Sequence, residues 1–264
     1  MALAGVLGYP VGHSRSPLMM SAAFRELGLD WRYLKLPVQP ALFEETVRAL
    51  AASGYVGANV TIPHKLAALG LADQMSPAAE AIGAANTLSF AGDGITADNT
   101  DAGGLLAALE EPVAGRRALV LGAGGAGRAA VWALREAGAE VSVWNRTHER
   151  AAALAADLGV AHAETPGPTE LLVNATSVGL LADTGEEDAL AALQLTAVAP
   201  PEMVVDLVYG DAPTPLWRWA SRGGARVVGG LEVLVRQGAL SLELWTGLVA
   251  PVEAMRHAVS PSGA

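Results

Sequence analysis

Cysteine is absent from this chain, and lysine and the amides are scarce. The 264 residues include no Cys, two Lys, five Asn and four Gln. Without cysteine there can be no disulfide framework, no Cys-ligated zinc or iron–sulfur site and no thiol nucleophile. No apolar run approaches the ~18 residues of a membrane span. The first residues have no basic region ahead of their apolar stretch, so we expect no export signal and a cytoplasmic location.

Positive charge is also limited, since the formal net charge is −10. Nucleic-acid binding needs a basic surface that this balance does not supply, although a local basic pocket for a small anion remains compatible with it. The five histidines show no metal-ligand spacing along the chain, so no metal site is expected. We therefore expect a soluble globular protein with a small-molecule partner and no membrane or nucleic-acid partner, either monomeric or homodimeric.

The first hundred residues alternate short apolar runs with longer helical patterns. Such alternation predicts parallel strands joined by right-handed helical crossovers, and a hairpin turning at Ala91-Gly92-Asp93 follows. The predicted strands are Gly5 to Tyr9, Trp31 to Pro37 and Tyr55 to Ile62, the helices are Pro17 to Leu27 and Pro40 to Ser53, and the hairpin strands are Thr87 to Phe90 and Gly94 to Ala97.

A second alternating block begins after the polar stretch 110–117 and has the size of a doubly wound nucleotide-binding domain. We therefore expect two α/β domains with a cleft between them. Residues 1–101 with 236–264 form the first domain, and residues 102–235 form the second. Predicted strands in the second block are 118–122, 140–144, 171–173 and 203–208, with helices at 126–137 and 149–158 and a helical tail at 231–259 broken at Gly247 and Pro251.

A glycine-rich segment follows the first strand of the second block and opens an alanine-rich helix. It reads Gly122-Ala123-Gly124-Gly125-Ala126-Gly127. Glycine lets backbone approach a pyrophosphate closely, and the helix N-terminus offers free N–H groups and a positive dipole end. The alternative is a tight turn that binds nothing, but such a turn does not require this many glycines. The segment predicts a dinucleotide site.

The end of the next strand distinguishes NADP from NAD. Asn145, Arg146 and Thr147 stand where NAD-binding domains usually carry an acidic residue for the ribose 2′-OH, and Arg150 follows within one turn. Guanidinium groups suit a 2′-phosphate, which a carboxylate would repel. The alternative is a solvated helix start, although cations are disfavoured there. NADP is the predicted cofactor.

Two further segments of the first domain carry polar residues suited to a site. Ser16 stands before Pro17, which predicts an N-cap, and Ser14 and Ser16 could also face an anionic group at the same helix start. Lys65 ends the segment Asn-Val-Thr-Ile-Pro-His-Lys at the carboxyl end of a strand. Lysine, unlike arginine, can release its proton, so Lys65 is a candidate proton-transfer group; the alternative is an ordinary surface lysine.

Asp101 is the predicted partner of Lys65, with a helix N-cap as its alternative role. A carboxylate beside the amine would orient it and share its proton. The five asparagines fall in segments that we predict to be site loops, at positions 59, 86, 99, 145 and 174.

Together these motifs resemble the shikimate dehydrogenase family over essentially the whole chain. Their order and spacing both agree with the family pattern. The segments that carry the resemblance are Gly-His-Ser-Arg-Ser-Pro at 12–17, Asn-Val-Thr-Ile-Pro-His-Lys at 59–65, Gly-Ala-Ala-Asn-Thr at 83–87, Asn-Thr-Asp at 99–101, the glycine segment, Asn-Arg-Thr at 145–147, Asn-Ala-Thr-Ser at 174–177 and residues 237–245.

The resemblance implies an oxidoreductase that interconverts 3-dehydroshikimate and shikimate with NADP, a step towards aromatic amino acids. It implies that Lys65 is the general acid or base and Asp101 its partner. It also implies that Leu207 and Gly230 border the nicotinamide. The implied substrate contacts are Ser14, Ser16 and Tyr209 at the carboxylate, and Thr61, Asn86, Asp101 and Gln237 at the ring hydroxyls.

The chain departs from the family pattern at Ala102, at Gly210-Asp211 and at Glu232-Val233, where the family usually has Gly, Asn-Pro and Gly-Met. None of these departures removes a proton-transfer or carboxylate-binding group, but we expect different nicotinamide contacts where valine replaces methionine. Two other functions stay open. One is a broader quinate/shikimate dehydrogenase or a paralogue acting on another cyclic polyol acid, and the other is a non-catalytic NADP-binding sensor.

Overall fold

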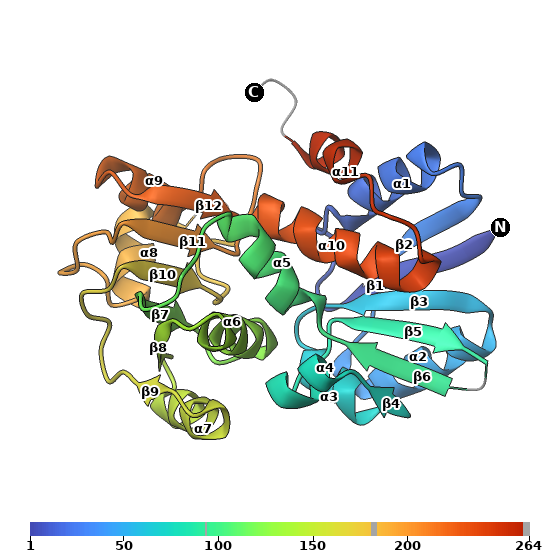
Figure 1. The fold of residues 1–264 in the computed structure, drawn as a ribbon, viewed down its shortest axis with the longest axis horizontal. Helices are drawn as coiled ribbons and strands as arrows, with labels where there is room; N and C mark the ends of the chain where they lie inside the picture. The colour runs from blue at the N-terminus through green and yellow to red at the C-terminus, as the bar shows by residue number, and fades with distance from the viewer. Residues whose placement is uncertain (93, 181–183, 261–264) are drawn as a thin grey trace. The chain divides into compact units, whose positions relative to one another are not determined.

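A computed structural model describes residues 1–92, 94–180 and 184–260 of the chain. It divides into two compact units, one formed by residues 1–104 and 234–264 and the other by residues 105–233. Helices α5 (Thr100–Leu109) and α10 (Gly230–Thr246) each contribute residues to both units. We describe each unit by itself, with the labels of Figure 1.

The first unit is built on a mixed six-stranded sheet in the order β2-β1-β3-β5-β6-β4. β1 pairs in parallel with β2 and β3, as the helical crossovers predict, whereas β5 pairs antiparallel with β3 and β6. The predicted hairpin is thus confirmed, and Asp93 of its turn lies outside the described residues. The strands are β1 (Ala2–Gly8), β2 (Trp31–Pro37), β3 (Tyr55–Val60), β4 (Gln74–Met75), β5 (Thr87–Ala91) and β6 (Gly94–Asp98).

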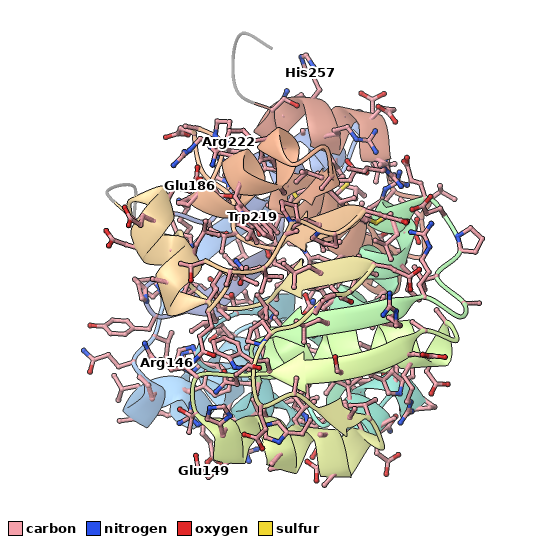
Figure 2. All side chains as sticks on the ribbon, turned by 90° about the vertical axis from the view of Figure 1, so that its left-hand side faces the viewer. Arg146, Glu149, Glu186, Trp219, Arg222 and His257 are labelled. Atoms are coloured by element: carbon pink, nitrogen blue, oxygen red, sulfur yellow. The ribbon has the colours of Figure 1, made fainter. Side chains whose placement is uncertain are left out.

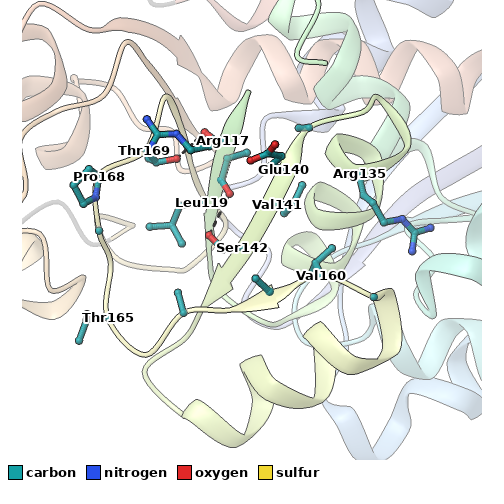
Figure 3. Close-up of a pocket in the computed structure, with 16 residues that line it drawn as sticks. Arg117, Leu119, Arg135, Glu140, Val141, Ser142, Val160, Thr165, Pro168 and Thr169 are labelled. Atoms are coloured by element: carbon teal, nitrogen blue, oxygen red, sulfur yellow. Dashed lines mark hydrogen bonds between the residues drawn. The ribbon is translucent and has the colours of Figure 1, made fainter. Parts of the chain in front are cut away.

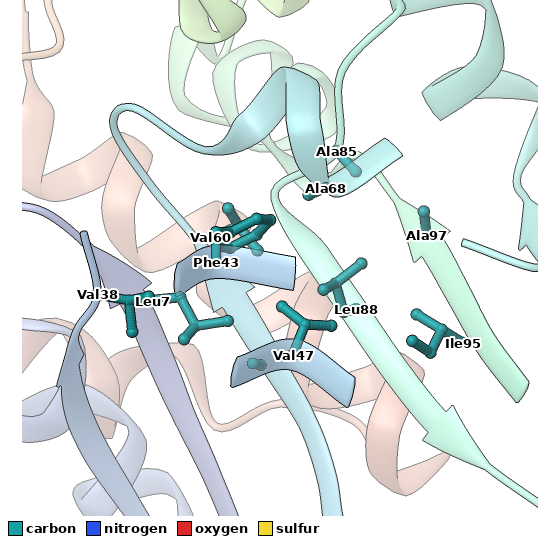
Figure 4. Close-up of a cluster of buried hydrophobic side chains, with 11 residues drawn as sticks. Leu7, Val38, Phe43, Val47, Val60, Ala68, Ala85, Leu88, Ile95 and Ala97 are labelled. Carbon is teal, nitrogen blue, oxygen red and sulfur yellow. The ribbon is translucent and has the colours of Figure 1, made fainter. Parts of the chain in front are cut away.

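Apolar side chains of β1, β3, β5 and β6 meet those of the second helix to form the core of this unit (Figure 4). Phe43 and Val47 extend from α2 towards Leu7, Val60 and Leu88, and all of these side chains are buried. This packing holds β3 in place, and Lys65 follows shortly after the carboxyl end of this strand. The remaining elements are α1 (Ser16–Glu26), the 3-10 turn η1 (Pro40–Leu42), α2 (Phe43–Ala52), α3 (Lys65–Gly70), α4 (Pro77–Ile82) and α11 (Val252–Val259).

The second unit is a doubly wound sheet whose strands all run parallel, in the order β12-β11-β10-β7-β8-β9. The order reverses between β7 and β10, and in open α/β sheets ligands bind beyond the carboxyl ends of the strands at such a switch point. The strands are β7 (Arg117–Leu121), β8 (Glu140–Trp144), β9 (Ala161–His162), β10 (Leu171–Asn174), β11 (Met203–Asp206) and β12 (Arg226–Gly229).

Helices pack on this sheet in two pairs. α6 (Gly125–Glu136) and α7 (His148–Leu158) contact β7, β8 and β9, whereas α8 (Glu186–Ala192) and α9 (Pro215–Arg222) contact each other and α9 contacts β11 and β12 (Figure 1). Trp144, Leu172 and Trp219 are among the buried side chains of the core. The predicted tail is also confirmed, because α10 ends before Gly247, at φ +67°, and α11 begins after Pro251.

The predicted N-cap at Ser16 is wrong by one residue. Ser16 is already the first residue of α1, and Arg15 is the N-cap. The Arg15 carbonyl accepts from the N–H groups of Leu18 and Met19, which makes Arg15 the residue that begins the helical ladder. The Ser14 hydroxyl accepts from the Ser16 N–H at 3.3 Å, so Ser14 supplies the side-chain acceptor at this helix start.

None of the helices in the described part of the chain is both long and apolar enough to cross a lipid bilayer.

Candidate active site

Lys65 and Asp101 form an ion pair in the first unit. Lys65 is the first residue of α3, and its Nζ donates to Asp101 Oδ2 at 2.6 Å. The two side chains are only 12% and 18% exposed, so water screens the pair less than it would on an open surface. The geometry therefore holds a lysine ammonium and a carboxylate within proton-transfer distance, as predicted from the sequence.

Asp101 is not the N-cap of its helix. α5 begins at Thr100, and the Asn99 side-chain oxygen accepts from the N–H groups of Asp101 and Ala102 at 3.1 and 3.4 Å. The capping role that we considered for Asp101 thus belongs to Asn99. The Asp101 carboxylate remains available for Lys65 and for Asn86, whose Nδ2 donates to Asp101 Oδ1 at 2.9 Å.

Asn86 connects the ion pair to a buried polar network. Its Nδ2 also lies 3.1 Å from Gln237 Oε1, and its Oδ1 accepts from the Thr100 N–H at 2.7 Å. Gln237 belongs to α10, and its Nε2 is held by the Leu234 carbonyl. A Cβ at Gly104 would lie 2.6 Å from the Gln237 nitrogen, so a glycine there allows α10 to approach α5 this closely. Asn86, Asp101 and Gln237 are thus distant in the sequence but lie together in the folded unit.

The prediction that every asparagine marks a site loop is wrong for Asn59 and Asn174. Both lie within strands and are buried. Asn59 Nδ2 donates to Ser241 Oγ at 2.8 Å, and its Oδ1 accepts from the Tyr33 hydroxyl at 2.7 Å. These bonds join β2, β3 and α10 from inside the unit.

The loop between β1 and α1 carries Ser14 and leads into Ser16, and both serines are buried. Thr61 follows β3 and approaches the same strand end, since a Cβ on Gly8 would lie 2.4 Å from Thr61 Cγ2. The Thr61 N–H is also bonded to the Leu7 carbonyl at 2.8 Å. Serine and threonine hydroxyls therefore stand at the carboxyl ends of neighbouring parallel strands.

The glycine segment of the second unit forms the turn from β7 into α6. Gly122 has φ +111°, and a Cβ there would lie 2.9 Å from the Ala175 carbonyl oxygen. A Cβ on Gly127 would lie 2.0 Å from the Gly122 oxygen, whereas nothing lies within 4 Å of one on Gly124. Gly122 and Gly127 thus permit the turn itself, and Gly124 leaves space above it for a phosphate at the start of α6.

The neighbouring turn from β8 into α7 carries the predicted 2′-phosphate contacts. Asn145 Oδ1 accepts from the Ala123 N–H at 3.3 Å, and its Nδ2 donates to the Thr147 carbonyl at 3.0 Å. Arg146 and Arg150 are exposed, with Arg146 labelled in Figure 2, and no carboxylate of the described residues pairs with either. Two guanidinium groups are therefore free to bind an anion beside the glycine turn.

Leu207 and Gly230 also lie next to each other, at the carboxyl ends of two neighbouring strands of this sheet. Leu207 follows β11 and Gly230 follows β12, and a Cβ on Gly230 would lie 2.5 Å from the Leu207 carbonyl oxygen. Tyr209 is on the loop after β11, in the second unit. The role of Tyr209 at the substrate carboxylate stays a prediction.

Asp206 is a buried carboxylate at the end of β11, within a segment whose apolar residues predict a strand. It accepts from Asn174 Nδ2 at 2.9 Å, from the Val208 N–H at 3.2 Å and from the Thr214 hydroxyl at 2.5 Å. Thr214 in turn caps α9 through the Trp217 N–H. Burial raises the pKa of the Asp206 carboxyl to about 6, although each of these hydrogen bonds acts to lower it. Asp206 thus joins β10, β11 and the start of α9 at the carboxyl ends of the strands.

This raised pKa predicts a specific pH dependence of stability. From pH 4 to about 6 the folded chain keeps a proton on Asp206 that the unfolded chain, with a pKa near 3.8, has released. The contribution of Asp206 to the free energy of unfolding therefore falls as the pH rises, by about 3 kcal/mol in total at ~1.4 kcal/mol per pKa unit.

Urea unfolding of the wild type and of Asp206→Asn at several pH values measures this effect. The stability of the wild type minus that of Asp206→Asn should fall between pH 4 and 7. Asp188→Asn, which changes an exposed carboxyl group, should show no such trend. A difference between wild type and Asp206→Asn that does not change with pH contradicts the assignment.

A pocket lies at the amino ends of strands of the same sheet, opposite the glycine turn (Figure 3). Arg117 and Glu140, at the amino ends of β7 and β8, are among the residues that line it. Arg117 is paired with Glu170, and Arg135 is bonded to the Leu158 carbonyl at 2.6 Å. Arg117 and Arg135 of this pocket thus already have partners within the protein.

A doubly wound nucleotide unit, joined to a unit that holds a lysine–carboxylate pair among hydroxyl and amide groups, defines the class of nicotinamide-dependent oxidoreductases. Comparison with known proteins agrees with this class. Residues 6–88 match the model of the shikimate dehydrogenase substrate binding domain, residues 106–206 that of shikimate/quinate 5-dehydrogenase, and residues 230–259 that of the shikimate 5′-dehydrogenase C-terminal domain.

Full-length relatives extend these matches. The chain is 46% identical to the NADP(+) shikimate dehydrogenase of Anaeromyxobacter dehalogenans strain 2CP-1, over 98% of this chain and 95% of the relative. It is 44% identical to that of Methanopyrus kandleri, over 97% and 93%. The shikimate 5-dehydrogenase structure from Thermus thermophilus superposes with a TM-score of 0.87 at 43% identity, covering 98% of both chains. The chain belongs to the shikimate dehydrogenase family.

Proposed function

We propose that this chain catalyses the reversible, NADP-dependent reduction of 3-dehydroshikimate to shikimate, a step towards the aromatic amino acids. The observation that carries the proposal is the 2.6 Å contact between Lys65 Nζ and Asp101, surrounded by amide and hydroxyl groups. It is supported by the Thermus thermophilus relative, whose structure is a complex with NADP(H) and shikimate.

Lys65 and Asp101 perform the proton transfer in this proposal. When bound, NADPH would supply a hydride for the carbonyl carbon at C3. Lys65 donates a proton to the developing C3 alkoxide, and in the reverse direction it takes the proton from the C3 hydroxyl. Asp101 holds the Lys65 side chain in place through the hydrogen bond between Lys65 Nζ and Asp101 Oδ2.

The substrate is held by polar groups of the first unit. Asn86 and Gln237, already bonded to each other, bind ring hydroxyls together with Asp101 and Thr61. The hydroxyls of Ser14 and Ser16, at the start of α1, bind the carboxylate, where the helix dipole also favours a negative charge. From the second unit, Tyr209 is proposed to add a phenol hydroxyl at the carboxylate end.

The cofactor binds to the second unit, whose residues fit it. The turn from Gly122 to Gly127 would hold the pyrophosphate, since nothing lies within 4 Å of a Cβ on Gly124. Arg146 and Arg150 would bind the 2′-phosphate together with Asn145 and Thr147, and Leu207 and Gly230 would border the nicotinamide. An NAD-specific site would carry a carboxylate in place of this basic turn.

Three further assignments belong to the proposal. Residues 1–101 with 236–264 form the substrate-binding domain, and residues 102–235 form the NADP-binding domain. The enzyme works in the cytoplasm. It is a monomer or a homodimer, which sedimentation of the purified protein distinguishes.

Steady-state oxidation of shikimate and of quinate, each with NADP and with NAD, tests the function through absorbance of the reduced nicotinamide. We expect kcat/KM to be highest for shikimate with NADP. Turnover of quinate with NAD that equals or exceeds it would point to the broader quinate/shikimate type. Binding of NADP without turnover of either acid would point to a non-catalytic sensor.

A further inference from the structure

Two histidines and a glutamate that are distant in the sequence meet on the second unit. His148 is the first residue of α7, His162 ends β9, and Glu164 follows two residues later. One nitrogen from each imidazole and one carboxylate oxygen lie within 4.8 Å of one another. His148 Nδ1 and His162 Nδ1 are each 3.6 Å from an oxygen of Glu164.

These side chains face one another without making hydrogen bonds. In the part of the chain that the structure describes, three buried side-chain polar atoms lack a hydrogen-bond partner, and two of them are His148 Nδ1 and His162 Nε2. Buried polar groups are nearly always satisfied, so such atoms point to a partner that the protein itself does not supply. For His148 Nδ1, the nearest carboxylate oxygen is Glu164 Oε2 at 3.6 Å, too far for a hydrogen bond, so a cation bound between this nitrogen and the carboxylate would satisfy both groups.

We propose that His148, His162 and Glu164 form a binding site for a divalent transition-metal ion, represented by Zn²⁺. Bonds of about 2.0–2.2 Å to nitrogen and oxygen place tetrahedral ligands roughly 3.3–3.6 Å apart. His148 Nδ1 lies 3.6 Å from Glu164 Oε2 and His162 Nδ1 lies 3.6 Å from Glu164 Oε1, so each imidazole stands at a ligand-like distance from one oxygen of the carboxylate. Water completes the coordination, because the Glu164 side chain is 81% exposed and leaves the site open to solvent.

The ligand types decide the class of ion. Imidazole nitrogen suits Zn²⁺, Ni²⁺ and Cu²⁺, whereas Mg²⁺ and Ca²⁺ prefer a shell of oxygen ligands. The site is separate from the proposed reaction, which uses no metal. A bound ion would connect His148, the first residue of α7, to Glu164 in the segment after β9. The turn that carries Arg146 directly precedes α7.

Metal binding is measured directly on the tag-free, chelator-treated full-length protein, by competition with a chromophoric zinc chelator. We expect one Zn²⁺ per chain, no binding of Mg²⁺ under the same conditions, and a rise in the thermal midpoint with Zn²⁺. Co²⁺ should give the visible absorption bands of a site with few, nitrogen-rich ligands.

Glu164→Gln and His162→Ala should each weaken zinc binding at least about tenfold, since loss of even an outer-shell partner costs that much. Glu164→Gln changes an exposed side chain and keeps the fold testable. His257→Ala is the matched control, because His257 is an exposed histidine outside the cluster and its loss should leave zinc affinity unchanged. Equal zinc affinity in the wild type and Glu164→Gln, or Mg²⁺ binding as tight as Zn²⁺, overturns the proposal.

Discussion

Replacing Lys65 by alanine should lower kcat by roughly 10² to 10⁴, the range for loss of a general acid or base. The KM for shikimate should change much less, because the groups proposed to bind the ring and the carboxylate remain. Cofactor binding should be unchanged, since the glycine turn and both arginines lie on the second unit. Single-turnover and steady-state rates in both directions measure the effect, and an unchanged kcat refutes the assigned role.

Two companion variants separate proton transfer from charge. Lys65→Arg keeps the cation beside Asp101, but a guanidinium cannot release its proton, so kcat should stay low. Recovery of kcat in Lys65→Arg would show that only the charge matters. Lys35→Ala removes the other lysine of the chain and should keep kcat, with any effect confined to KM because Lys35 contacts the Gly12 carbonyl near Ser14.

Asp101→Asn completes the test, since the pair is proposed to act as a unit. The double variant with Lys65→Ala should be barely slower than Lys65→Ala alone, because residues that act together are strongly non-additive. Full additivity of the two losses would show that Asp101 acts independently of Lys65.

Alanine at Gly124 and alanine at Gly127 should have opposite signatures. At Gly127 the new methyl group would stand 2.0 Å from the Gly122 carbonyl oxygen, which is backbone and cannot move aside cheaply. Overpacking of this kind costs about 1–3 kcal/mol or more, so the ligand-free protein should unfold at lower urea concentration. At Gly124 the methyl group meets nothing within 4 Å, and ligand-free stability should stay near that of the wild type.

Cofactor affinity then distinguishes the two positions. Gly124→Ala fills the space proposed for the pyrophosphate, so the Kd for NADP should rise while the fold is intact. Titration of NADP by protein fluorescence, beside urea unfolding, gives both readouts for each variant. Unchanged NADP affinity in Gly124→Ala would mean that the pyrophosphate does not lie over this turn.

The sequence predicted most of the elements that carry the active site. Strand periodicity and the glycine segment located β7, α6 and the edge of the sheet on which Arg146 and Arg150 lie. Lys65 and Asp101 could be paired before any geometry was known, because scarce lysine and the Asn-Thr-Asp segment stood at predicted strand and helix ends. The short helices α3, α4, α8 and α9 and the strands β4, β9 and β12 were missed, since segments this short show little periodicity.

The errors share one physical cause, which is that hydrogen-bond partners are chosen in space. Ser16 looked like an N-cap beside Pro17, yet the ladder begins one residue earlier at Arg15. Asp206 sat in an apolar run, and only the convergence of Asn174 and Thr214 explains a buried carboxylate there; a lone aspartate within such a run was the available signal. The proposed pairing of His148 with His162 likewise arises only in the folded chain.

The substrate half of this enzyme is completed late in synthesis. Residues 1–104 make one unit with residues 234–264, and the hydrogen bonds of Asn59 and Asn86 to Ser241 and Gln237 need the last helices. When residue 233 has left the ribosome, every residue of the second unit has therefore been released. The first unit still lacks residues 234–264 at that point. Because domains tend to fold as they emerge, the cofactor half can fold first, and a chain truncated before α10 lacks the Ser241 and Gln237 partners of Asn59 and Asn86.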